Sequence, residues 1–197
     1  MSKIILSGVL LLAMFQGYAQ PNNPFNQRGL DYLRSVEIVK ADIDAGKQLE
    51  LDEATISHYS QIIPLKHEVT PELAAEVASA LKNPEFNFIE SVQSSSLSEF
   101  TKETLVSLVV NSKPGDQESY KKFLVEKTNE ILSGPVREDE KEFLLTQVAI
   151  VYNVANNDSN TKCYVTSERY QQEIDCVTYG VVTGAYIGFT LCGPWCA

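Results

Sequence analysis

Apolar residues recur every three or four positions through most of the chain, which is the spacing that places them on one face of a helix. The first series predicts a helix that stops at Gly46, because glycine commonly follows a helix C-terminus. A shorter helix is predicted from Asp52 to Ile63, where Pro64 ends it. The apolar positions of the first series are Leu30, Leu33, Val36, Val39 and Ile43.

Two further helix starts are indicated by a capping residue followed by proline. Thr70 can accept hydrogen bonds from free backbone N–H groups, and Pro71 at the first helical position has no N–H to leave unsatisfied. Asn83 and Pro84 repeat this combination thirteen residues later. The pattern predicts short helical units rather than a repeat array, because the spacing does not recur elsewhere.

Three longer helices are predicted in the second half. Ser96 and Glu99 have the spacing of a capping box ahead of a helix that reaches about Asn111. Another helix is predicted over 116–132, and the last over 137–155. Because strand patterns are almost absent before residue 160, the sequence predicts an all-α fold, an irregular multi-helix bundle. The apolar face of the last helix comprises Phe143, Leu144, Val148, Val151 and Tyr152.

The N-terminus has the three-part form of an export signal over residues 1–19. Lys3 supplies the positive start, and the apolar run 4–15 is shorter than the roughly 17–25 residues that a spanning helix needs. Small residues within 17–19 predict cleavage before Gln20. No cysteine directly follows the apolar run, so the sequence predicts a secreted or periplasmic protein without a lipid anchor.

Charge and candidate chemistry exclude several classes of function. The 197 residues carry a formal net charge of −10, which argues against nucleic acid as a partner because phosphate binding requires clustered Lys and Arg. The two histidines, His58 and His67, lie in no metal-ligand or catalytic spacing. The sequence therefore predicts no enzyme, with no catalytic residues, no metal site and no cofactor.

The cysteines are confined to the C-terminal end. A polar linker, 156–162, separates the helical domain 20–155 from a module over 163–197. In an exported chain an even number of cysteines predicts disulfides, and four cysteines leave three pairings open. The "CGPWC" ending resembles the motif of thioredoxin-like proteins but has one residue too many between its thiols. The predicted disulfide cysteines are Cys163, Cys176, Cys192 and Cys196.

The apolar segment 176–197 is the part of the sequence most suggestive of an interaction. Three glycines four residues apart would form a smooth stripe on a helix, and a helix of this length would extend roughly 33 Å. The same residues also alternate as a strand would, so helix and hairpin both stay open. The predicted contact residues toward a membrane or partner are Gly180, Gly184, Gly188, Tyr186, Phe189 and Trp195.

The layout of signal peptide, helical region and short cysteine-bearing tail resembles that of secreted bacteriocin-like precursors, whose membrane-active peptides carry glycine-zipper stretches. The resemblance implies a tail that acts on membranes. The residues themselves favour a different function, an exported non-enzymatic protein that acts in binding, structure or envelope interaction, with an unknown protein or envelope component as partner. The bacteriocin-like or toxin precursor is the alternative.

Overall fold

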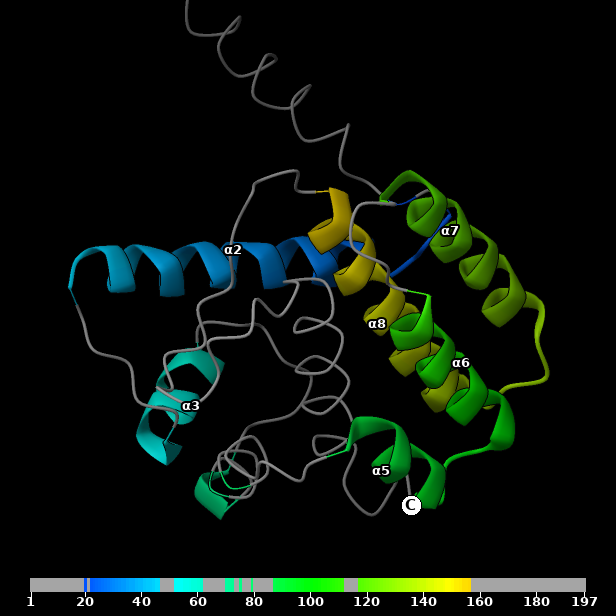
Figure 1. Ribbon diagram of the computed structural model, residues 1–197, viewed down its shortest axis with the longest axis horizontal. Helices are drawn as coiled ribbons and strands as arrows, with labels where there is room; N and C mark the ends of the chain where they lie inside the picture. Colours follow the sequence, from blue (N-terminus) through cyan, green and yellow to red (C-terminus); the bar gives the residue numbers. More distant parts are fainter. Residues whose placement is uncertain are drawn as a thin grey trace, which may run out of the picture.

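The computed structural model of the chain describes residues 20, 22–46, 52–61, 70–72, 75, 79, 87–111 and 117–156. Every regular element within these residues is a helix, which confirms the all-α prediction for this part of the chain (Figure 1). The predicted disulfide module 163–197 lies outside the described residues, as do nearly all of the linker 156–162 and the signal peptide 1–19.

One helix, α8, forms the centre of the described fold. The helices α2, α6 and α7 each pack against α8, and α5 packs against α6. Figure 1 shows α2 crossing the view while α7 runs obliquely, so the bundle is irregular rather than a set of parallel helices. The helices are α2 (Asn26–Asp44), α3 (Glu53–Ser60), α5 (Phe88–Ser94), α6 (Glu99–Val110), α7 (Gln117–Ser133) and α8 (Glu138–Asn156).

More residues of α8 are buried than its predicted apolar face contains. Four residues of its predicted apolar face are buried, and the fifth, Tyr152, packs half-buried against the core. Other faces are buried as well, because three helices, α2, α6 and α7, all pack against α8. The buried residues outside the predicted face are Glu140, Leu145, Gln147, Ala149, Ile150, Asn153 and Ala155.

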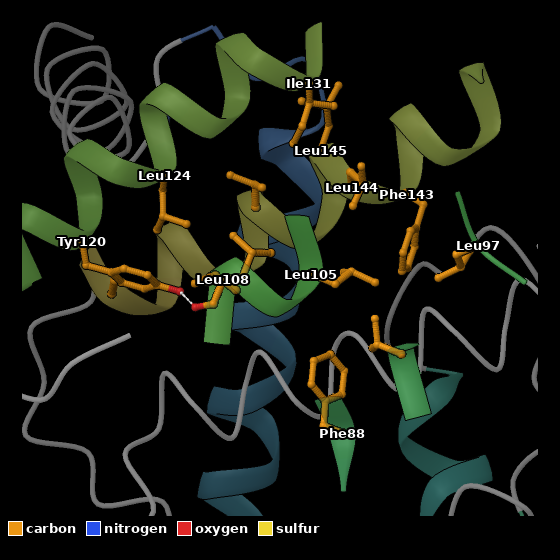
Figure 2. Close-up of a cluster of buried hydrophobic side chains, with 14 residues drawn as sticks. Phe88, Leu97, Leu105, Leu108, Tyr120, Leu124, Ile131, Phe143, Leu144 and Leu145 are labelled. Atoms are coloured by element: carbon orange, nitrogen blue, oxygen red, sulfur yellow. Dashed lines mark hydrogen bonds between the residues drawn. The ribbon is translucent and has the colours of Figure 1, made fainter. Parts of the chain in front are cut away.

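The core is a cluster of aliphatic and aromatic side chains from α5 to α8. Figure 2 shows Leu105 and Leu108 of α6 facing Leu124 of α7 and Leu144 of α8, and all four are fully buried. The hydroxyl of Tyr120 donates to the backbone carbonyl of Leu108 at 2.6 Å. Carbonyl groups in the last turn of a helix have no partner within the helix. The bond therefore satisfies the end of α6 and ties it to α7.

Most predicted helix boundaries agree with the structure. The helix α2 begins at Asn26, and Gly46 follows its end, as predicted, with a left-handed φ of 84°. The helix α3 begins directly after Asp52, whose carboxylate accepts a hydrogen bond from the backbone N–H of Thr55 at 2.8 Å. Pro71, as predicted, occupies a helical position after Thr70.

Two starts differ from the prediction. The helix α6 is capped by Ser98 and not by Ser96, because the Ser98 hydroxyl accepts from the backbone N–H of Thr101 at 3.3 Å. The helix α5 begins at Phe88 after an Asn87 cap, a start that the sequence reading missed. The start predicted at Asn83 and Pro84 lies outside the described residues.

Candidate functional site

The residues that the sequence singles out for contact with a membrane or partner lie outside the described residues, as do the cysteines and His67. The structure consequently does not test whether they come together. His58 is described and lies exposed on α3. The predicted interaction residues are Gly180, Gly184, Gly188, Tyr186, Phe189 and Trp195, and the cysteines are Cys163, Cys176, Cys192 and Cys196.

Within the described part of the chain, no three His, Cys, Asp or Glu side chains are grouped so that they could hold a metal ion. The helices described there also include none with the length and apolar character needed to cross a membrane. The candidate sites in this part are therefore two clusters of buried polar side chains.

The first cluster joins the residues before α2 and its first residue to α7 and α8, and we call it the N-terminal cluster (Gln20, Asn23, Asn26, Thr128 and Asn153). The side chain of Gln20 is almost fully buried, with 3% of its surface exposed. Its Nε2 donates to Thr128 Oγ1 at 2.7 Å and to the backbone carbonyl of Leu124 at 3.2 Å, both on α7. A residue at the predicted cleavage point is thus bound inside the helical domain.

The asparagines extend this cluster from α7 to α8. Asn23 Nδ2 donates to Gln20 Oε1 and to the backbone carbonyl of Leu145 on α8, each at 2.8 Å. The backbone N–H of Gln20 donates to Asn26 Oδ1 at 2.9 Å, and Asn153 Nδ2 donates to the same oxygen at 3.0 Å. Buried amides without partners are costly, so these mutual bonds make the conformation of the entering chain specific.

Two backbone features, at Asn22 and Gly29, allow the residues before α2 and its first turn to pack closely against the other helices. Asn22 has a left-handed φ of 64°, a conformation that asparagine tolerates better than most residues. Gly29, one turn into α2, lies directly against α8. A Cβ atom at Gly29 would lie 2.4 Å from the backbone oxygen of Ala149 and 2.6 Å from Asn153 Nδ2. Only glycine therefore permits α2 to approach α8 this closely.

The second cluster joins the first turns of α6 and α8, and we call it the carboxylate cluster (Ser98, Thr101, Arg137 and Glu140). The Glu140 side chain is 2% exposed, although glutamate is rarely buried. Its Oε2 accepts short hydrogen bonds from the hydroxyls of Ser98 and Thr101. Its Oε1 accepts from Arg137 Nη2 at 2.7 Å. Both carboxylate oxygens are therefore bound by donors.

These contacts decide the protonation state of Glu140. Burial raises the pKa of its carboxyl, but hydrogen bonds from Ser98, Thr101 and Arg137 together outweigh burial, so the pKa is lowered from its ordinary value. The carboxylate is also in the first turn of α8, where the helix dipole favours negative charge. Glu140 therefore stays ionised, and both of its oxygens accept hydrogen bonds. In this state it links α6 to α8 and is a poor proton donor.

Both clusters were missed by the sequence reading, and only weak signals for them existed. The start "QPNNPFNQ" is rich in amides and proline, which indicates a loop and gives no sign of burial. Glu140 belongs to the acidic run at the start of the last predicted helix, for which the helix dipole is a sufficient reason. Which of these three consecutive acidic residues is buried depends on how α6 packs against α8.

Comparisons with known proteins were made by family, by sequence and by structure. No family model, curated protein or solved structure matched the chain.

Proposed function

We propose that the protein is exported, is cleaved before Gln20, and acts without catalysis as an α-helical binding or structural protein of the envelope or the exterior. The observation that carries the proposal is the burial of Gln20. A signal peptidase leaves its product with a new N-terminus, and the residue expected there is bound to α7 through its side chain and to Asn26 through its backbone.

The location of this residue supports a domain that begins where the signal ends. The sequence-based cleavage point depends on small residues before Gln20, whereas the contacts with Leu124 and Thr128 depend on residues more than one hundred positions away. The cleavage pattern and the long-range contacts do not depend on each other, and both concern Gln20. A folded domain that starts directly at the cleavage point leaves no unstructured stub for proteases.

The intact mass and N-terminal sequence of the protein collected outside the cytoplasm test the proposal. We expect a chain that starts at Gln20. Retention of residues 1–19 in the exported protein, or its failure to leave the cytoplasm, would contradict it. Replacement of Ala19 by arginine is the control, because a large charged residue at the cleavage position should block processing.

The partner is proposed to be a protein or envelope component that contacts the module 163–197. Mass measurement with and without thiol alkylation tests the two proposed disulfides, since any free thiol would take up the alkylating reagent. The alternative function, a toxin precursor, is supported by the glycine stripe at Gly180, Gly184 and Gly188. Leakage from lipid vesicles caused by a 163–197 peptide, oxidised or reduced, would favour the toxin; no leakage in either form would rule it out.

A further inference from the structure

Cleavage before Gln20 would create an N-terminal residue with two groups that can react together. The free α-amine can attack Cδ of the residue's own carboxamide. An N–Cδ bond forms, the Cδ–Nε2 bond breaks, and Nε2 leaves as ammonia after accepting a proton from the amine. The product is a neutral five-membered lactam, and no oxidant or reductant takes part.

The structure binds these two groups to different elements. The backbone nitrogen of Gln20 faces Asn26 Oδ1 at the start of α2, at 2.9 Å. Its Nε2 faces α7, where it donates to Thr128 and Leu124, and its Oε1 accepts from Asn23. Ring closure needs the backbone nitrogen and Cδ to meet, so the side chain must first release α7.

We propose that Gln20 is a modification site controlled by the conformation of the chain: it stays an open glutamine in the folded domain and cyclises when the N-terminal cluster opens. This inference rests on the proposed cleavage before Gln20. The change is one-way, because the lactam has no Nε2 with which to bind Thr128 and Leu124 again. A cyclised N-terminus therefore identifies a molecule whose N-terminal cluster has opened. It also makes the closed form of the cluster less stable, because the hydrogen bonds to Thr128 and Leu124 cannot form again.

The test uses the chain 20–197, released from an N-terminal fusion by a protease that leaves Gln20 first. The protein is incubated folded or in urea, and mass spectrometry of the N-terminal peptide follows the loss of one ammonia. Thr128→Val removes the hydroxyl that accepts from Gln20 Nε2 and keeps the shape of the side chain. Tyr120→Phe is the matched control, since it removes a different buried hydrogen bond of the same helix, to Leu108.

We expect cyclisation in the folded wild-type protein to be at least about tenfold slower than in urea. Loss of about one buried hydrogen bond in Thr128→Val should raise the folded-state rate about fivefold, and Tyr120→Phe should leave it unchanged. Equal rates for the folded and denatured wild-type chain would overturn the proposal. So would equal acceleration by the two variants, because that result means global unfolding controls the reaction.

If Thr128→Val does not fold, the comparison of cyclisation rates between the folded and denatured wild-type chain still tests the proposal. The proposed function fails separately from this inference. An exported protein that starts at another residue contradicts the cleavage point, whereas the rate comparison concerns only the chain that begins at Gln20.

Discussion

Glu140→Gln is the substitution that most directly tests how the first turns of α6 and α8 are joined. It keeps the size of the side chain and removes its charge. In the native protein both hydroxyl partners, on Ser98 and Thr101, and the guanidinium of Arg137 donate to the carboxylate. The glutamine still accepts hydrogen bonds through one oxygen, but its Nε2 faces groups that act as donors in the native protein.

The size of the effect follows from these contacts. A hydrogen bond to a charged group contributes about 1 kcal/mol more than a neutral one, and two hydroxyl bonds are affected. The Arg137 side chain is 60% exposed, so its ion pair adds at most about 1 kcal/mol. Because the substitution also removes the desolvation cost of a buried charge, we expect the free energy of unfolding to fall by about 1–3 kcal/mol.

The pH dependence has a definite sign. The folded-state pKa of Glu140 is lowered, with burial opposed by the stronger effect of the Ser98, Thr101 and Arg137 hydrogen bonds, so the unfolded state binds the proton more readily. The stability that the carboxylate contributes is fully present above the ordinary pKa of 4.5 and is lost as the pH falls through the lower folded-state pKa. The difference between wild type and Glu140→Gln should therefore be constant near neutral pH and shrink below about pH 4.5.

Urea unfolding followed by circular dichroism, repeated from neutral to acidic pH, measures this difference. Glu138→Gln is the matched control, because Glu138 lies in the same first turn but is 89% exposed and pairs only with Lys141 at 3.0 Å among the described contacts. It should change the free energy of unfolding by less than about 0.5 kcal/mol. Equal effects of the two substitutions, or a pH-independent difference, would show that the Glu140 carboxylate does not stabilise the junction of α6 and α8 through its charge.

Three further predictions concern the packing and capping of the bundle, and urea unfolding measures each of them. Gly29→Ala should destabilise the protein by about 1–2 kcal/mol, because overpacking against the α8 backbone exceeds the gain of up to about 1 kcal/mol in helix propensity; a more stable variant would show that α2 and α8 can separate at little cost. Ser98→Ala should lower the free energy of unfolding by about 1–2 kcal/mol, and Ser96→Ala should lower it much less, because Ser98 caps α6. A larger loss in Ser96→Ala would show that Ser96 is the cap instead. Leu144→Ala should cost about 2–5 kcal/mol, whereas Leu132→Ala, at an exposed position of α7, should cost well under half as much; similar losses would argue against the central place of α8.

The helices that the sequence predicts best are those whose signals are local. Gly46 follows the end of α2, as predicted, and α7 ends at Ser133, one residue beyond the predicted end at residue 132. Backbone conformation at such positions depends on the residue itself and its near neighbours. Asp52 likewise caps α3 through a hydrogen bond from the backbone N–H of Thr55, only three positions away.

The two polar clusters could not be predicted in the same way. Ser96 and Ser98 are equally good caps by residue type, and the choice between them depends on the hydrogen bond from the Ser98 hydroxyl to Glu140, forty-two residues away. The loop-like start of the domain gives no sign that Gln20 meets Thr128. Residue type and spacing carry no information about contacts at these distances along the chain.

Periodic apolar residues and helix caps were enough to predict that the described part of the chain is built from helices, because secondary structure of this kind follows from interactions within one turn. The sequence also predicts that an export signal ends before Gln20. Tertiary packing alone places α8 at the centre, brings Gly29 directly against it, and buries Gln20 and Glu140. Those features require surfaces from several helices, and a side chain's burial depends on which of them it meets.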